Sequence, residues 1–234
     1  MKIFISQPTF FPWLGYFDMI DQVDKFIILD DVDFSYQSWQ HRNNFKTPNG
    51  LDFFTVPVVS KTKNKLIRFT KIDNAEFTKK KFLKFIESNY RKSQFFKLFE
   101  DDFIKITNKA FSHENIFDLN VEFIKWILNI LKINTEVYLS SSLNLKSKKI
   151  KKIIDICNYF KAKSYISTVG SKSYLSGNEH FFKENKIELI YHNYKHPSYT
   201  QLFEPYSDYA CILDLIFNEG YKSLSIIKSG RIVD

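Results

Sequence analysis

The sequence predicts an α/β protein built on a doubly wound, mainly parallel β-sheet that also carries a β-hairpin and a helical insertion. Five short apolar runs have the length and composition of buried strands, and helical segments separate most of them. These runs are residues 2–6, 25–29, 135–139, 164–167 and 187–191. Strands that alternate with helices along a chain are typical of a parallel sheet covered by helices.

The first thirty residues form the clearest unit of this alternation. The strand predicted over 2–6 stops at Gln7-Pro8, and apolar residues from Leu14 to Val23 have helical spacing. The next strand, over 25–29, follows directly and runs into a group of aspartates. A strand, helix and strand joined by so short a crossover favour parallel pairing with a right-handed connection.

A different pattern interrupts the alternation between residues 44 and 131. A strand, the turn Thr47-Pro48-Asn49-Gly50 and a second strand predict a hairpin over 44–59. Apolar residues spaced three and four apart then predict helices over 76–90, 94–110 and 115–131.

The alternation resumes near residue 134, with helices predicted over 145–160, 177–184 and 210–217. We therefore assign residues 1–75 and 134–220 to one discontinuous α/β core, 76–133 to a helical insertion and 221–234 to a tail.

The composition excludes several classes of protein. Of the 234 residues, 44% are hydrophobic and 25 are Phe, which is incompatible with disorder, and a chain of this length needs no disulfide or metal to stabilise it. No window approaches about 18 uncharged apolar residues, and the N-terminus lacks the features of a signal peptide. Cys157 and Cys211 are expected to be buried free thiols, and we expect a cytoplasmic protein without membrane insertion.

The formal net charge of +8 favours anionic partners such as nucleotides, phosphates or nucleic acid. The chain is also rich in Lys, Asn, Ile, Phe and Tyr, as AT-rich coding produces, so the charge carries little weight. The densest basic run, Lys146–Lys152, is expected to be the solvated face of a helix.

Doubly wound sheets bind ligands at the carboxyl ends of their strands, so we expect the loops after the strands 2–6, 25–29 and 164–167 to form the site. The loop after the first strand contains Gln7, Thr9, Trp13 and Tyr16, which could hold a base, a ribose or a phosphate. The alternative is that Pro8 and Pro12 end a strand and start a helix while the aromatic residues are buried.

The loop after the second strand contains Asp30, Asp31 and Asp33. These carboxylates could bind Mg²⁺ beside a phosphate, or one of them could orient His41 as a general base; the alternative is that they cap a turn. Arg42 and Asn43, which follow, are candidate substrate contacts.

Two later segments add polar candidates. Ser171 and Lys172 follow the 164–167 strand and suit a phosphate or carboxylate, although the segment does not match a Walker A loop. His192 and His196 lie in an extended segment where either could act as a general acid or base or be a surface residue. No cysteine accompanies them, and no metal is expected.

The two N-terminal segments QPTFFPWLGYFDMI and DKFIILDDVDFSYQSWQHRN, with STVGSKSYL and HPSYTQ…ILDLIFNEG further on, resemble the WbqC-like family from about Lys2 to Gly220. The resemblance implies a bacterial cytoplasmic protein encoded among genes for O-antigen or other surface polysaccharides. Some of those loci make 4-amino-4,6-dideoxyglucose with an N-linked glycyl or related acyl group.

A more distant resemblance is to the nucleotidyltransferase fold group that includes pantothenate synthetase, which carries a His-x-Gly-His signature. Here the comparable stretch reads Trp13-Leu14-Gly15-Tyr16. Those enzymes adenylate a carboxylate and pass it to an amine, which would suit amide formation.

The resemblance and the loops together suggest an enzyme that N-acylates a nucleotide-linked amino sugar such as a dTDP-4-amino-4,6-dideoxyhexose, with N-glycylation as one candidate reaction. His41 would be the base, oriented by Asp31 or Asp33, and the other candidates would bind substrate: Gln7, Thr9, Trp13, Tyr16, Arg42, Asn43, Ser171, Lys172 and His196. The acyl donor is open, with ATP or an activated donor such as an aminoacyl-tRNA as alternatives. Two other functions remain: a metal-dependent glycosyltransferase, and an RNA- or tRNA-binding accessory protein that uses the Lys146–Lys152 face.

Overall fold

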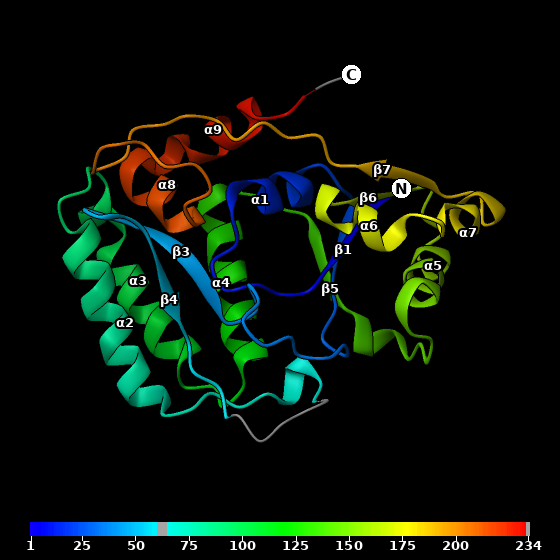
Figure 1. Cartoon of the computed structure of the whole chain (residues 1–234), viewed down its shortest axis with the longest axis horizontal. Helices are drawn as coiled ribbons and strands as arrows, with labels where there is room; N and C mark the ends of the chain where they lie inside the picture. The colour runs from blue at the N-terminus through cyan, green and yellow to red at the C-terminus, as the bar shows by residue number, and fades with distance from the viewer. Residues whose placement is uncertain (60–64, 233–234) are drawn as a thin grey trace.

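The computed structural model describes residues 1–59 and 65–232, and within these a five-stranded parallel sheet forms the centre of the molecule (Figure 1). Its strands are β1 (Lys2–Ser6), β2 (Lys25–Ile28), β5 (Glu136–Leu139), β6 (Ser164–Ser167) and β7 (Glu188–Tyr191). Their order in the sheet is β5-β2-β1-β6-β7, and every neighbouring pair is parallel. The predicted fold class and the parallel pairing of the first two strands are confirmed.

Helices cover both faces of the sheet. The α-helices in the described residues are α1 (Leu14–Asp21), α2 (Ala75–Tyr90), α3 (Phe96–Ala110), α4 (Ile116–Leu131), α5 (Lys149–Tyr159), α6 (Lys172–Leu175), α7 (Glu179–Glu184), α8 (Ile212–Glu219) and α9 (Ser223–Ser229). Successive side chains of a strand point to opposite faces, so Phe4 packs into a core with α1, α4 and α8, whereas Ile3 and Ile5 pack into a second core with α5 and α7.

The order of the strands reverses between β1 and β6. The chain goes from β1 through β2 to β5 at one edge and then returns to β6 beside β1, before it reaches β7 at the other edge. The crossovers of the two halves contribute to different cores, which is the arrangement of a doubly wound sheet. The carboxyl ends of β1 and β6 therefore mark the place where a ligand crevice is expected.

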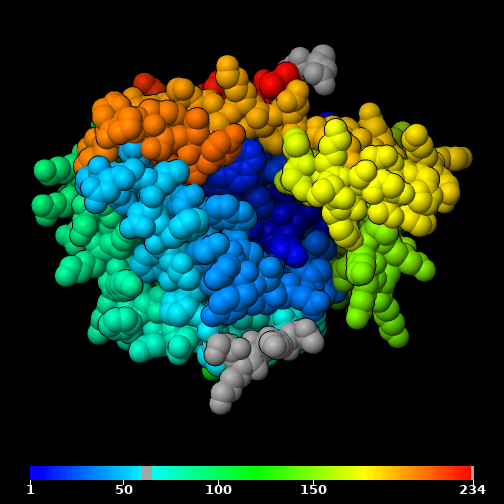
Figure 2. Space-filling view, in the orientation of Figure 1, coloured from blue at the N-terminus to red at the C-terminus, as the bar shows by residue number. Residues whose placement is uncertain are grey.

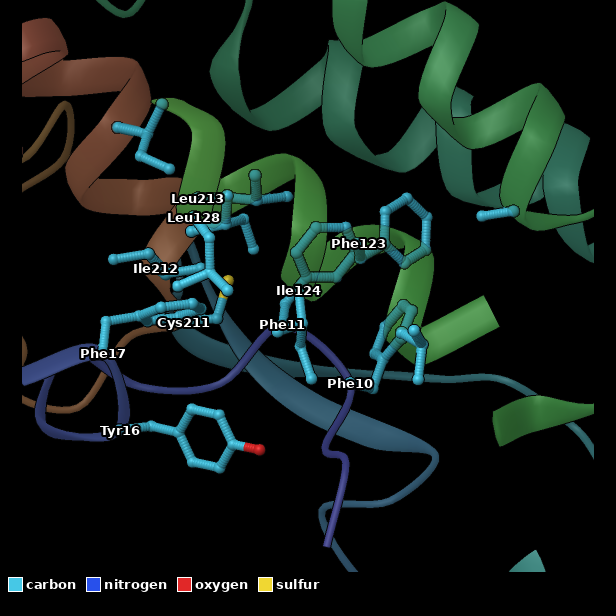
Figure 3. Packing of buried hydrophobic residues seen from close by; sticks show 14 of the residues in the cluster. Phe10, Phe11, Tyr16, Phe17, Phe123, Ile124, Leu128, Cys211, Ile212 and Leu213 are labelled. Carbon is cyan, nitrogen blue, oxygen red and sulfur yellow. The ribbon is translucent and has the colours of Figure 1, made fainter. Parts of the chain in front are cut away.

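The hairpin of β3 (Arg42–Thr47) and β4 (Gly50–Thr55) is separate from the sheet and packs beside α2 (Figure 1). Phe10 and Phe11 of the first loop reach into the aromatic core between the hairpin and α4 (Figure 3). Asn43 fixes this loop, because its Nδ2 donates to the carbonyls of Phe10 (2.9 Å) and Phe11 (2.7 Å). The insertion thus shares one continuous core with the first face of the sheet.

Several local expectations need adjustment. The helix predicted over 145–160 begins at Lys149. The predicted tail includes helix α9, which contacts α1. Residues 233 and 234 of the tail lie outside the described part. Lys152 is not on a solvated face: it is 5% exposed and pairs with Asp31.

Cys157 and Cys211 are both buried free thiols, as predicted, and burial raises the pKa of Cys157 to about 12. In the described part of the chain, no helix combines the length and apolar character needed to cross a membrane.

A buried polar network holds the segment between β7 and α8. Asp214 of α8 is fully buried and accepts hydrogen bonds from the Tyr199 hydroxyl (2.8 Å) and Gln201 Nε2 (2.9 Å). Lys46 of the hairpin is also fully buried and donates to Ser207 Oγ (2.9 Å) and to the Pro205 carbonyl. This network anchors the 199–207 segment to the hairpin and to α8.

Burial raises the pKa of Asp214 from 3.8 to about 6, against the opposing effect of its hydrogen bonds and of Lys46. The folded chain binds this proton more tightly than the unfolded chain does. The bound proton therefore contributes to the free energy of unfolding fully below pH 3.8, and this contribution is lost as the pH rises through 6. We expect the wild type to lose about 1.4 kcal/mol of unfolding free energy relative to Asp214→Asn between pH 5 and pH 8. Urea unfolding of both proteins at the two pH values measures this difference, and a difference that does not change with pH would contradict the burial argument.

Candidate functional site

A cleft of about 670 Å³ opens at the carboxyl ends of β1, β6 and β7, where the strand order reverses. Figure 2 shows a hollow with the N-terminal segment at its floor, bordered by the hairpin, the segment after β6 and the 200–211 segment. Ser6 at the end of β1, Thr168–Gly170 after β6 and His192 after β7 line this cleft. The cleft lies where the prediction from the sheet topology places a ligand.

Aromatic side chains make up much of the cleft wall. Trp13 lies edge-on to Tyr194, with ring centroids 5.5 Å apart, and 5.9 Å from Tyr209. Gly15, at the start of α1, allows this position of Trp13, because a Cβ at Gly15 would lie 2.2 Å from the indole ring. A wall of rings with few polar groups is typical of a small-molecule site.

We expect Gly15→Ala to push the Trp13 indole out of the cleft wall. Alanine favours a helix by about 1 kcal/mol over glycine, and this gain offsets the cost of moving the indole. The unfolding free energy should therefore change little, whereas the environment of Trp13 should change strongly. Near-UV circular dichroism measures the environment and urea unfolding the stability. Gly170→Ala is the matched control, since a Cβ there meets only Thr168 Oγ1, at 3.9 Å; identical near-UV spectra for Gly15→Ala and wild type would refute the prediction.

His192 and Asp18 form a buried pair in the wall of the cleft. His192 Nε2 lies 2.7 Å from Asp18 Oδ2, and the two side chains are 5% and 0% exposed. A carboxylate only accepts, so Nε2 carries a proton, and in the neutral form of the ring Nδ1 then has the lone pair. Among the residues that the structure describes, no hydrogen bond engages Nδ1, and the ring stacks on Tyr194 with centroids 5.2 Å apart.

Asp18 is held from several sides. Its Oδ1 accepts from Arg231 Nε at 2.5 Å, and its Oδ2 also accepts from Gln22 Nε2 at 2.6 Å. Arg231 additionally pairs with Asp21. The residues after α9 therefore help to fix the carboxylate that orients His192, and a carboxylate so placed fixes the tautomer of its imidazole partner.

The first loop contributes three of its four candidates to the cleft: Thr9, Trp13 and Tyr16 line it. The Tyr16 hydroxyl donates to the Gln7 carbonyl (3.1 Å), and burial raises its pKa far above the usual value. The side chain of Gln7 instead accepts from Gln40 Nε2 at 2.6 Å, so it braces the second loop.

Asp30 and Asp31, which follow β2, belong to a separate cluster at the ends of β2 and β5. Asp30 accepts from Ser140 Oγ (3.0 Å) and the Ser141 amide (2.8 Å), and Asp31 pairs with Lys152 and accepts from Ser140. Burial raises the pKa of Asp31, but the hydrogen bonds from Lys152 and Ser140 outweigh it and hold the pKa below its usual value. The donors of this cluster already engage both carboxylates.

His41 is 4% exposed, and the backbone engages both of its ring nitrogens. Nδ1 donates to the Val56 carbonyl (3.0 Å), and Nε2 accepts from the Gln37 amide (3.1 Å). Burial lowers the pKa of this neutral ring. The structure brings neither Asp31 nor the exposed Asp33 to it, and Asp33 forms a bridge with Leu66 instead. We therefore leave His41 out of the proposed chemistry.

The remaining candidates lie in or around the cleft. Asn43 lines it, and Arg42 stacks on Phe53 of the hairpin with its guanidinium carbon 4.7 Å from the ring centroid. Ser171 Oγ is hydrogen-bonded to Thr168 Oγ1 (2.8 Å), and Lys172 Nζ lies 5.7 Å from the centroid of the Tyr191 ring. Neither Ser171 nor Lys172 is among the residues that line the cleft.

His196 supports the segment that carries Tyr209. Its Nε2 accepts from the Tyr209 amide (3.3 Å), and its Nδ1 lies 3.3 Å from the Tyr206 hydroxyl. Burial lowers its pKa, and the nearby Asp208 only partly offsets this. His196 thus acts on the cleft through Tyr209.

Sequence reasoning missed Asp18 and did not place His192 beside it. A local signal exists for Asp18: it lies in a helix whose residues from Leu14 to Ile20 are otherwise apolar or glycine, and all of them are buried. A buried carboxylate in such a helix must have partners. The sequence does not identify these partners, which lie 174 and 213 residues further along the chain.

The fold and the site define a doubly wound α/β protein with an aromatic cleft and a buried His–Asp pair at the switch point of its sheet. The chain belongs to the WbqC-like protein family, whose model matches residues 7–226. A relative from Mycobacterium tuberculosis (strain ATCC 25618 / H37Rv), described as the uncharacterized protein Rv1507c, is 33% identical over 232 residues, which is 98% of this chain and 99% of the relative. No solved structure matches the chain significantly.

Proposed function

We propose that this protein transfers an acyl group, with glycyl as one candidate, to the amine of a nucleotide-linked amino sugar such as a dTDP-4-amino-4,6-dideoxyhexose. The reaction would belong to the biosynthesis of O-antigen or another surface polysaccharide in the bacterial cytoplasm. The observation that supports it best is the His192–Asp18 pair, which offers an imidazole nitrogen beside an aromatic cleft of about 670 Å³. The gene loci associated with the WbqC-like family supply the substrate class.

His192 is the general base of this proposal. The sugar amine attacks the carbonyl carbon of an activated acyl donor, a C–N bond forms, and the bond from that carbon to its leaving group breaks. Nδ1 takes the proton that the amine loses and returns it to the departing group. Asp18 keeps the ring oriented and stabilises its charged form, as the carboxylate of a triad does.

The other cleft residues position the substrate. The rings of Trp13, Tyr194 and Tyr209 offer apolar faces to the sugar, and Thr9 and Asn43 offer polar groups. The donor is an activated acyl group, such as an aminoacyl-tRNA, an acyl thioester or an acyl group activated by ATP, and the proposal assigns no metal to the step.

The test combines binding with product analysis. A thermal-shift screen against dTDP-, UDP- and GDP-amino sugars identifies the acceptor, because a ligand at about 100 times its Kd adds about 2.7 kcal/mol of stability. The acceptor is then incubated with glycine and ATP, with glycyl-tRNA or with acyl-CoA, and mass spectrometry follows the sugar. We expect an N-acylated nucleotide sugar from one of these donors.

Other products would overturn the proposal. Release of the nucleoside diphosphate with transfer of the sugar, lost on addition of EDTA, would identify a glycosyltransferase. Binding of tRNA in a strongly salt-dependent manner, with no shift from any nucleotide sugar, would identify an RNA-binding protein.

A further inference from the structure

Two large aromatic rings are exposed at the outer rim of the cleft, where the hairpin begins. Trp39 is 52% exposed and Phe53 is 46% exposed, and their ring centroids lie 6.0 Å apart with an interplanar angle of 31°. A ligand that covered these two rings would bury apolar surface, which is favourable.

Arg42 adds a positive charge to this rim. Its guanidinium carbon lies 4.7 Å from the centroid of Phe53, and the two residues lie on the same face of the hairpin, since Phe53 pairs with Asn44, two residues from Arg42. Arg68 and Arg231 both pair with carboxylates, whereas in the described part of the chain no carboxylate pairs with Arg42. A guanidinium held on a ring offers several donors to one oxyanion, in the geometry that suits a phosphate.

The rim is continuous with the cleft and has a fixed backbone. Trp39 itself lines the cleft, and its carbonyl accepts from the Phe10 amide at 2.8 Å. On the same side, Asn43 lines the cleft and holds the first loop through two carbonyls. A ligand that extends along the cleft from His192 toward the hairpin therefore meets Trp39, with Phe53 and the Arg42 guanidinium beside it.

We infer that Trp39, Phe53 and Arg42 form a platform for a nucleoside diphosphate: the base stacks on Trp39, and Arg42 binds the diphosphate. This inference rests on the proposed function, since it locates the nucleotide part of the nucleotide-linked sugar and leaves the amine-bearing sugar for the His192 end. Stacking of a base on an aromatic side chain accounts for roughly 5- to 150-fold in affinity.

Trp39 also provides the readout. Of the 3 Trp residues of the chain, Trp126 lies away from the cleft, and Trp13 lines the part of the cleft assigned to the sugar, which thymidine diphosphate lacks. Titration with thymidine diphosphate should quench tryptophan fluorescence in the wild type, and Trp39→Phe should lose most of the quenching. In calorimetric titrations, Trp39→Ala should raise the Kd for thymidine diphosphate about tenfold or more. Trp126→Phe is the matched control: Trp126 lines a groove between α3 and α4, and its replacement should change neither measurement.

Arg42 is tested with probes that separate charge from stacking. Arg42→Gln should lower the affinity for thymidine diphosphate about tenfold and leave the affinity for thymidine unchanged. Arg42→Lys should lose less affinity for the diphosphate than Arg42→Gln does. Failure of thymidine, uridine and guanosine diphosphates to bind the wild type, or unchanged Kd values in both Trp39→Ala and Arg42→Gln, would overturn the platform.

The two proposals fail separately. If diphosphate binding depends on Trp39 but no donor yields an acylated sugar, the platform stands and the acyl-transfer function falls. If the acylated sugar forms but Trp39→Ala binds the nucleotide sugar as tightly as the wild type, the function stands and the platform falls.

Discussion

His192→Gln is expected to turn over the amino sugar about 100-fold or more slowly than the wild type, because the variant lacks the ring nitrogen that accepts the proton of the amine. The glutamine amide can still donate to Asp18 Oδ2, which accepts from His192 at 2.7 Å in the wild type, so the fold and the cleft should persist. The measurement is the rate of product formation at saturating donor, together with the Kd of the acceptor. We expect the rate to fall and the Kd to change by less than about threefold.

The matched control is His180→Gln, since His180 is an exposed residue of α7 whose ring packs at a tilt against Phe181. Its rate should equal that of the wild type. A His192→Gln enzyme that retains a rate within a few-fold of the wild type would remove His192 from the mechanism. Loss of acceptor binding together with the rate would instead give His192 a role in binding.

The fold was largely predictable because its signals are local. Each strand of the sheet is a short apolar run, and the helices of both halves show their spacing within a few residues of their observed ends. The alternation of these elements predicts the doubly wound class, and the class predicts the edge of the sheet where the cleft opens. The strand order itself, β5-β2-β1-β6-β7, needed the structure.

The candidate site was less predictable because its interactions join distant parts of the chain. Asp31 and His41 are ten residues apart and chemically suited to each other, yet Asp31 pairs with Lys152 and His41 with two backbone groups. Proximity along the chain therefore indicated the wrong neighbours for both. The pair that does form joins α1 to the residue after β7, which only the packing of the whole sheet brings together.

Lys152 is a member of a charged run that nevertheless faces the core side of its helix. It lies among lysines, so composition alone predicts a solvated face. Its spacing of four residues from the fully buried Ile156, however, places it on the inner side of α5. The half-buried carboxylate of Asp31, which pairs with Lys152, supplies the reason for a lysine at that position.

Asp18→Asn is expected to lower the free energy of unfolding by about 3 kcal/mol, the lower end of the range for breaking a buried ion pair. Asp18 is fully buried and accepts from Arg231, Gln22 and His192, and an asparagine cannot accept from all three. The lower end applies because Arg231 is 25% exposed and also pairs with Asp21. Urea unfolding at neutral pH measures the loss, and Asp101→Asn, an exposed position on α3, should cost less than about 0.5 kcal/mol.

The double variant Asp18→Asn/Arg231→Gln separates the ion pair from the orientation of His192. Removing both charges should recover part of the stability, since the penalty of Asp18→Asn comes largely from the cation left without its buried partner. Catalytic rate should not recover, because the carboxylate that orients the imidazole is still missing, and we expect it to stay about 100-fold below the wild type. A double variant that regains the wild-type rate would show that Asp18 serves only to anchor the residues after α9. One that regains neither rate nor stability would show that the two charges do not act as a pair.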